Sequence, residues 1–308
     1  MTFPPYQVLQ HALRNDFMAF LAKTVATVSP GATYLPNWHL EAISAHLQDA
    51  AAGKLRRLII TMPPRMLKSV TVSVAWPAWI LGHSPQARIM VASYAQSLSS
   101  KHSQDCRLVM QSPWYQEIFP ATQLALDQNE KEKFVTTERG HRIAVSVGGA
   151  ATGEGGNILI VDDPLNPLQA LQANARESCN AWFEHTFASR LDDKRRGSIV
   201  IVMQRLHAED LAGYLSKKAG WHVLSLPALA PEDCEIRWGR FYKFRSAGEA
   251  LHSAREDAEM LAQLAREIGS ANFAAQYMQM PAHSSHAMLK PEWFSRFALE
   301  QWRDGVAP

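Results

Sequence analysis

Five short apolar segments recur along the chain, and each is rich in β-branched residues. They span residues 58–61, 88–92, 158–161, 199–203 and 223–226. Because apolar positions follow one another instead of alternating with polar ones, both faces of each segment are expected to be buried, as in a parallel sheet. Helical patterns lie between most of these segments. The sequence therefore predicts an α/β fold with a mainly parallel central sheet and helices on both faces.

Further elements follow from local patterns. Residues 134–137 and 142–147 flank a polar turn, which predicts a β-hairpin that extends the sheet in antiparallel fashion. Residues 248–268 and 272–279 predict two late helices, and the N-terminal segment predicts helical pieces broken near residues 29–31. One amphipathic helix is predicted from residues that recur at helical spacing, namely Leu171, Ala175, Cys179, Trp182, Phe183 and Phe187.

Composition narrows the picture. The 308 residues, 47% of them hydrophobic, suffice for one large domain with an appendage, and the weaker pattern after Pro231 divides the chain into residues 1–230 and 231–308. A formal net charge of +2 excludes a basic field over the whole chain, so any nucleic-acid contact requires a local patch. Three scattered cysteines support neither a zinc site nor a disulfide framework. No apolar run is long enough to span a bilayer.

The loop after the first predicted strand carries candidate chemistry. Residues 62–69 read MPPRMLKS and precede a predicted helix. This order is typical of the phosphate-binding pattern G-x-x-x-x-G-K-[ST], in which the lysine contacts the outer phosphates and the hydroxyl binds Mg²⁺. Met62 and Leu67 occupy the glycine positions, and the two prolines offer no N–H, so the donors must come from residues 65–69. For this loop alone, a proline-stiffened turn with a surface lysine remains an alternative.

A second motif supplies acids. Residues 157–164 read NILIVDDP, which places Asp162 and Asp163 at the carboxyl end of a predicted strand, where open α/β sheets bind ligands. Asp162 is expected to hold Mg²⁺, and Asp163 to orient or deprotonate an attacking water. Many such enzymes carry the longer Glu at the second position. A solvated Asp-Asp-Pro turn is the alternative, but both motifs in this chain order favour a site for ATP.

With these motifs the chain resembles the large terminase subunit of tailed bacteriophages and prophages, in particular its N-terminal ATPase domain. Four ordered blocks between about residues 38 and 293 carry the resemblance: residues 62–69, residues 152–164, VMQRLH at 202–207 followed by Asp210-Leu211, and FAAQYMQ at 273–279 with Pro281. The resemblance implies an ASCE-type P-loop NTPase fold. It also implies a motor that hydrolyses ATP, with Mg²⁺, to move double-stranded viral DNA into a procapsid.

The resemblance also implies roles for individual residues. Asp163, Arg65, Gln204 and Arg205 are the implied catalytic residues, where Arg65 senses or stabilises the γ-phosphate and Gln204 and Arg205 couple the ATP state to movement. The family usually carries Thr or Ser before that second arginine, and a polar cluster capping the next helix is the alternative. Ser69 and Asp162 are the implied magnesium ligands. The implied nucleotide contacts are Pro64, Arg65, Met66, Leu67, Lys68, Ser69 and Val70.

The implied partners are double-stranded DNA, a portal protein, a small terminase subunit and further copies of the chain in a ring, typically a pentamer. A monomer in isolation is the alternative. The implied location is the host bacterial cytoplasm, with transient docking on the procapsid portal. An arginine finger is expected in trans, with Arg139, Arg142, Arg190, Arg195 and Arg196 as candidates.

In this scheme residues 1–230 form the ATPase domain, and residues 231–308 form a lid or linker that leads towards a nuclease domain absent from the chain. Nuclease activity is therefore not expected. Two other functions stay open at this point. One is a helicase-like P-loop ATPase that acts on nucleic acid, and the other is a degenerate, non-hydrolysing nucleotide-binding assembly module.

Overall fold

The centre of the molecule is an eight-stranded sheet in the order β3-β4-β5-β2-β6-β7-β1-β8, seen in a computed structural model that describes residues 5–149 and 153–282. In this spatial order the six strands β5, β2, β6, β7, β1 and β8 run parallel to their neighbours, whereas β4 pairs antiparallel with β5 and β3 pairs antiparallel with β4. The strands are β1 Arg57–Thr61, β2 Arg88–Ser93, β3 Leu124–Asn129, β4 Lys133–Thr136, β5 His141–Ser146, β6 Ile158–Asp162, β7 Ser198–Met203 and β8 His222–Ser225. The five predicted core strands and the predicted hairpin, β4 with β5, are confirmed.

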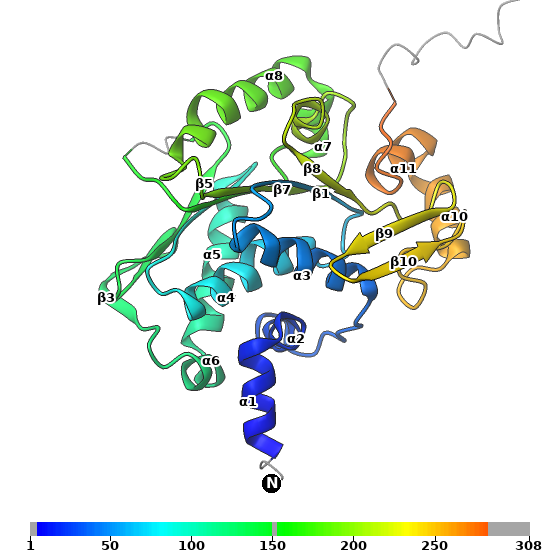
Figure 1. Ribbon diagram of the computed structural model, residues 1–308. Coiled ribbons are helices and arrows are strands. Elements are labelled where there is room, and N and C mark those ends of the chain that lie inside the picture. The colour runs from blue at the N-terminus through cyan, green and yellow to red at the C-terminus, as the bar shows by residue number, and fades with distance from the viewer. Residues whose placement is uncertain (1–4, 150–152, 283–308) are drawn as a thin grey trace, which may run out of the picture.

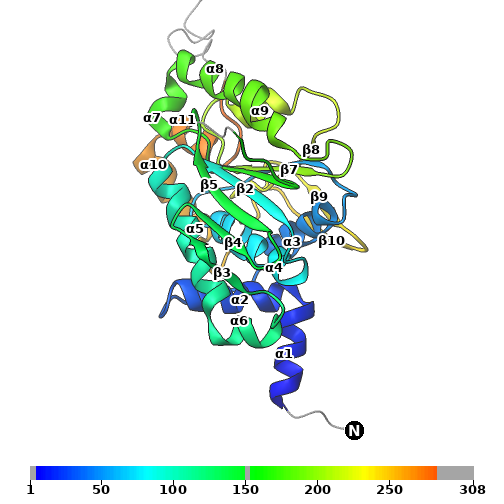
Figure 2. The ribbon, with the colours of Figure 1, turned by 90° about the vertical axis from the view of Figure 1, so that its left-hand side faces the viewer.

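Helices cover both faces of the sheet, as predicted (Figure 1). Figure 2 shows α8 and α9 on one side of the strands and α3 and α4 on the other. The helices are α1 Pro5–Asn15, α2 Phe17–Val28, α3 Trp38–Ala51, α4 Trp76–His83, α5 Gln96–Gln111, α6 Pro113–Ile118, α7 Pro167–Leu171, α8 Ala173–Trp182, α9 Leu211–Leu215, α10 Ala258–Ile268 and α11 Ser270–Gln276. Shorter segments are the π-helices η1 Val70–Ala75 and η2 Phe183–Phe187 and the 3₁₀ turn η3 Ala188–Arg190.

Two apolar clusters explain why the core strands show no polar alternation. Leu58 and Ile60 of β1 join the cluster under α2 to α6, whereas Ile59 joins the cluster under α8 and α9. The same division holds in β7, where Val200 and Ile201 lie in different clusters. Because successive side chains of a strand point to opposite faces and both faces are covered, the middle residues of these strands are apolar without interruption, and the buried polar residues Thr61 and Ser198 lie at strand ends.

The predicted helix over residues 171–187 is wrong in its first part. Gln172 is extended, with φ −90° and ψ 120°, and separates α7 from α8. Leu171 consequently lies on α7 with 72% of its surface exposed, whereas Cys179, Trp182, Phe183 and Phe187 are buried as predicted. Trp182 and Phe187 belong to two consecutive helical segments, because the chain widens into η2 after residue 182.

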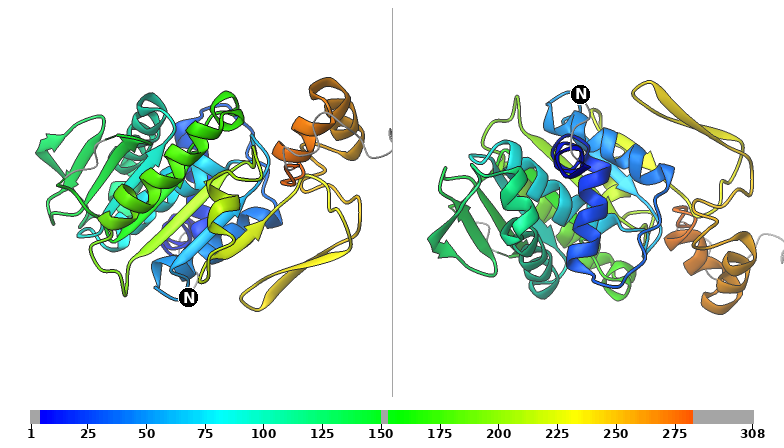
Figure 3. Two further views of the ribbon diagram at one scale, coloured as in Figure 1. Left: turned by 90° about the horizontal axis from the view of Figure 1, so that it is seen from above. Right: turned by 90° about the horizontal axis from the view of Figure 1, so that it is seen from below.

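The segment after residue 231 also differs from the prediction. Strands β9 Cys234–Trp238 and β10 Phe241–Arg245 form a two-stranded antiparallel sheet that the sequence analysis missed. The predicted helix over residues 248–268 begins only at α10, because Asp257 caps it by accepting a hydrogen bond from the Met260 N–H at 2.9 Å. Figure 3 shows the β9–β10 hairpin and α10 and α11 beside the main sheet. Thr152 and residues 283–308, which entered the sequence-based predictions, lie outside the described residues.

No helix in the described ranges 5–149 and 153–282 has the length and apolarity needed to cross a membrane.

Candidate nucleotide-binding site

The loop after β1 is anchored by its apolar residues. The Met62 N–H bonds to the Met203 carbonyl at 3.2 Å, and Met62 and Met66 are buried. On either side of Met66 the backbone turns sharply, with φ of +64° at both Arg65 and Leu67. Leu67 holds the position where G-x-x-x-x-G-K-[ST] has its second glycine, and a positive φ at a residue with a Cβ costs about 1–2 kcal/mol. The loop therefore keeps the positive φ of the second glycine position although a leucine occupies it.

A helix begins directly at the loop. The Thr71 N–H bonds back to the Leu67 carbonyl at 2.9 Å, so Lys68 and Ser69 lie in the first helical turn. The first N–H groups of a helix have no acceptor within it, and they lie at the positive end of the helix dipole. This geometry favours an anion such as a phosphate. The helix continues as the wide π turn η1 instead of the regular helix expected from the sequence.

Asp162 ends β6 and is completely buried. It accepts hydrogen bonds from Ser69 Oγ at 3.1 Å and from Ser73 Oγ at 2.7 Å. The two serines lie one helical turn apart, so the helix presents both hydroxyls to one carboxylate. Burial raises the pKa of Asp162, and the ammonium of Lys68 and both serine hydroxyls act in the opposite direction.

Asp163 forms an ion pair with Lys68, with 2.9 Å between Oδ2 and Nζ. Its other carboxylate oxygen accepts the Gln204 N–H at 3.2 Å. Burial alone would lower the pKa of Lys68, but the carboxylates of Asp163 and Asp162 raise it, so this amine is a cation. Asp163 has φ +47°, a left-handed backbone that re-aims the side chain at the end of the strand. The structure thus brings together Lys68, Ser69, Asp162 and Asp163 at one edge of the sheet.

The remaining predicted residues take different places. Arg65 is exposed on the loop, and Gln204 is half-buried beside Asp163. Arg205 Nε donates to both carboxylate oxygens of Asp210 at 2.9 and 3.0 Å, and Asp210 caps α9. The guanidinium of Arg205 therefore serves the helix cap, which was the structural alternative for this motif, and a catalytic role for it stays a prediction.

Arg205 also links the site to the late part of the chain. Its backbone N–H donates to Gln279 Oε1 at 3.0 Å. Gln279 is nearly buried and has a positive φ of 58°. Two of the sequence blocks, residues 202–207 and 273–279, thus meet in space, a contact that sequence analysis did not predict.

Sequence analysis also missed a buried polar group behind Asp162. His102 Nδ1 lies 3.5 Å from Asp162 Oδ2, and the completely buried Arg142 donates to the Ser73 carbonyl at 3.1 Å. Burial lowers the pKa of His102 to about 4, helped by the charge of Arg142, so this histidine is neutral. Burial also lowers the pKa of Arg142, to about 10. The spacing of Ser69 and Ser73 was the available signal for this group. Arg142 was instead a candidate for the arginine finger in trans, and that candidate is wrong, because the completely buried side chain cannot reach a neighbouring copy.

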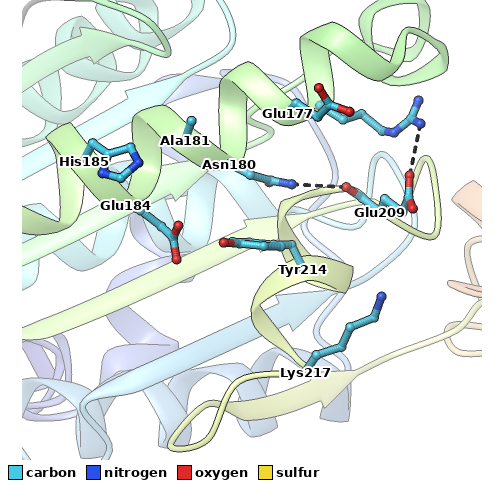
Figure 4. Close-up of a pocket in the computed structure, with 9 residues that line it drawn as sticks. Glu177, Asn180, Ala181, Glu184, His185, Glu209, Tyr214 and Lys217 are labelled. Carbon is cyan, nitrogen blue, oxygen red and sulfur yellow. Dashed lines mark hydrogen bonds and ion pairs between the residues drawn. The ribbon is translucent and has the colours of Figure 1, made fainter.

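A separate hollow of about 360 Å³ lies between α8 and α9 (Figure 4). Two contacts join α8 to the segment before α9. Arg176 forms an ion pair with Glu209 at 3.2 Å, and Asn180 donates a hydrogen bond to the Glu209 carbonyl at 3.4 Å. The hollow is lined by Arg176, Glu177, Asn180, Ala181, Glu184, His185, Glu209, Tyr214 and Lys217. None of these belongs to residues 62–69 or to the two acids, so the hollow is distinct from the candidate site.

The parallel sheet, the loop after β1 and the acids after β6 define a P-loop NTPase fold. No protein-family model matches the chain, and no curated protein matches its sequence. Solved structures do share its fold. The HK97 bacteriophage large terminase gives a TM-score of 0.53 at 14% identity, over 85% of this chain and 55% of that one.

The Thermus phage P74-26 large terminase ATPase domain gives a TM-score of 0.52 at 13% identity, over 79% of this chain and 93% of that one. A point mutant of the same domain gives 0.55 at 12% identity, over 81% and 95%. The predicted likeness to large terminase ATPase domains is therefore confirmed at the level of the fold. The chain spans only about half the length of the HK97 protein.

Proposed function

We propose that this chain is the ATPase motor part of a terminase large subunit, which hydrolyses ATP to translocate double-stranded viral DNA into a procapsid. The observation that carries the proposal is the meeting of Lys68, Ser69, Asp162 and Asp163 at one edge of the sheet. It occurs within a fold similar to the ATPase domains of two phage terminases. The similarity supports the fold, and the chemistry is argued from the residues below.

The residues present fit a magnesium-bound triphosphate. A buried lysine, a serine hydroxyl and a carboxylate stand beside a helix start whose N–H groups are free to bind an anion. Ser69 and Asp162 offer the hard oxygen ligands that Mg²⁺ prefers. When bound, the metal neutralises charge on the phosphate oxygens. The backbone N–H groups between Pro64 and Val70 would hold the phosphates that Lys68 contacts.

The ion pair of Lys68 with Asp163 suggests how the site changes on binding. As Lys68 turns to the phosphates, Asp163 Oδ2 loses its cation and becomes available to a water molecule. The Gln204 N–H continues to hold Oδ1, so the carboxylate keeps its orientation. Asp163 then accepts the proton of the attacking water as a general base.

Further roles complete the proposal. The exposed Arg65 would reach the γ-phosphate, because a guanidinium fork matches phosphoryl oxygens. Gln204 and Arg205 would report loss of that phosphate, and the bond from the Arg205 N–H to Gln279 gives this signal a route into residues 231–308. Residues 1–230 would then be the ATPase domain and the later segment its lid or linker.

The partners proposed are double-stranded DNA, a portal protein, a small terminase subunit and neighbouring copies in a ring. The place of action would be the host cytoplasm, with docking on the procapsid portal.

ATP turnover tests the proposal. Hydrolysis should occur with Mg²⁺ and double-stranded DNA at high protein concentration, which favours contact between copies, and Lys68→Ala should abolish it. Lys101→Ala removes an exposed lysine of α5 and is the matched control. Turnover that survives Lys68→Ala would overturn the proposal, and unwinding of a forked duplex would favour the helicase-like alternative.

A further inference from the structure

Basic residues gather at the amino ends of β1 and β7, on the edge of the sheet opposite the candidate site. Arg56 donates from its guanidinium to the Arg195 carbonyl at 2.9 Å, and Arg57 donates to the Gly197 carbonyl at 3.2 Å. These bonds tie the loop before β1 to the turn before β7. The set is here called the basic edge and consists of Lys54, Arg56, Arg57, Lys194, Arg195 and Arg196.

The basic edge is strongly charged for this chain. Its six cations are accompanied in the two segments by three carboxylates: Asp49, which pairs with Lys54, Asp192, which pairs with Arg88, and Asp193, which accepts the backbone N–H groups of Arg195 and Arg196. The resulting surplus is three positive charges, in a chain whose formal net charge is +2. The other residues together are therefore slightly acidic, and the positive field is local.

The cations of the basic edge are available for contact. All except the half-buried Arg57 are exposed. The side chains of Lys194, Arg195 and Arg196 make no ion pair within the described part of the chain. Arg56 and Arg57 use only carbonyl oxygens as acceptors, so their charges are not neutralised. Exposed like charges repel one another only modestly in water, and a bound anion would relieve this repulsion.

The composition of the basic edge indicates which anion fits. Four of its six cations are arginines, whose planar forks match phosphate oxygens. Protein interfaces are built around apolar anchors, yet no large exposed apolar side chain of the described residues falls within 49–57 or 190–197. The surface therefore resembles one that follows a phosphate backbone.

The position of the basic edge separates it from the nucleotide. β1 has five residues, so its first and last residues lie roughly 13 Å apart at the usual rise per residue. Lys68 and Ser69 follow the carboxyl end of β1, whereas the basic edge lies at the amino ends of β1 and β7. A polyanion on the basic edge and a nucleotide at the loop can thus be bound at the same time.

We propose that the basic edge binds the phosphate backbone of double-stranded DNA, without reading its sequence. This inference deepens the proposed function and depends on it for the class of partner. Contact of Lys and Arg with the DNA backbone releases counterions, so the affinity should fall steeply with salt. A plot of log K against the logarithm of the salt concentration should have a slope of about −0.9 for each phosphate contacted.

The test measures binding of a fluorescent 30-base-pair duplex to the whole chain, without nucleotide, over a series of salt concentrations. The variant Lys194→Ala/Arg195→Ala/Arg196→Ala should bind at least about tenfold more weakly near 0.1 M salt, with a slope shallower by up to about three. Arg195→Lys/Arg196→Lys keeps the charge and should retain most of the slope. The matched control removes three exposed cations elsewhere, Lys131→Ala/Arg240→Ala/Arg266→Ala, and should bind like the wild type.

Thermal unfolding of each variant checks that the turn still folds. Equal weakening by the control triple, or an unchanged slope in the basic-edge triple, would overturn the inference. Competition by polyglutamate as strong as by unlabelled duplex would point to an acidic protein instead and would also overturn it. Because ATP is absent, these outcomes are independent of whether Lys68→Ala stops hydrolysis, so failure of this inference and failure of the proposed function can be told apart.

Discussion

Replacement of Asp163 by Asn separates nucleotide binding from hydrolysis. Asn has the same shape, tolerates the positive φ of 47° and still accepts the Gln204 N–H, but it removes the charge paired with Lys68 at 2.9 Å. Breaking a buried ion pair costs about 3–5 kcal/mol. The Asp163 side chain is 19% exposed and Asp162 remains near the lysine, so we expect a loss of about 2 kcal/mol in the free energy of unfolding without nucleotide.

Nucleotide binding should respond in the opposite sense. In the wild type Lys68 must leave Asp163 before it can contact a phosphate, and in the variant this competitor is gone. The affinity for ATP should therefore stay equal or rise. Turnover should fall by about 10²–10⁴-fold, the usual contribution of a general base.

Urea unfolding, equilibrium ATP binding and single-turnover hydrolysis measure the three quantities. Asp127→Asn, at an exposed acid of β3, is the control. Turnover within tenfold of the wild type would refute the role of Asp163 as a base. A parallel loss of binding and turnover would refute the exchange of Lys68 between carboxylate and phosphate.

Three further predictions concern the same site. Leu67→Gly relieves a positive φ worth about 1–2 kcal/mol but adds conformational freedom to the unfolded chain. The free energy of unfolding in urea should therefore change by less than about 1 kcal/mol while ATP binding persists, and a loss above about 3 kcal/mol would contradict this. Ser73→Ala removes the 2.7 Å bond to the buried carboxylate of Asp162 and should cost about 2 kcal/mol in urea unfolding, and an unchanged stability would argue against that bond. His39 is buried beside Met66, and burial lowers its pKa to about 4. Because only the unfolded chain takes up this proton between pH 6.5 and 4, the contribution of His39 to stability is complete above pH 6.5 and falls by about 1.4 kcal/mol per unit below it. His102, with the same lowered pKa, contributes in the same way, so His39→Gln should make the pH dependence of urea unfolding shallower by about 1.4 kcal/mol per unit, and an identical pH profile would exclude the role of His39.

Much of the fold could be predicted from the sequence because the core strands are buried on both faces. The continuous apolar run of β1 and the NILIV segment before Asp162 leave few alternatives to parallel strands. The elements that were missed or misplaced depend on local backbone detail. The extended Gln172 breaks a helix whose apolar spacing looked continuous, and η1 widens where a regular turn was expected. Hydrophobic spacing does not encode these backbone changes.

The candidate site was predictable only as far as motifs reach. Both the loop 62–69 and the pair Asp162-Asp163 stand at the carboxyl ends of predicted parallel strands. Because these ends lie at the same side of the sheet, the sequence predicts that the two segments lie close together. The contacts of Arg142 with Ser73 and of Arg205 with Gln279 join residues 69 and 74 positions apart in the chain. Such long-range pairs leave no periodic signal in a single sequence, so only the folded structure reveals them.

A crystal structure with Mg²⁺ and a non-hydrolysable ATP analogue tests the central claim most directly. The account predicts triphosphate density between Lys68, Ser69 and Asp162, with the lysine amine moved from Asp163 to the phosphates. Analogue bound elsewhere, with Lys68 still paired to Asp163 at 2.9 Å, would contradict it.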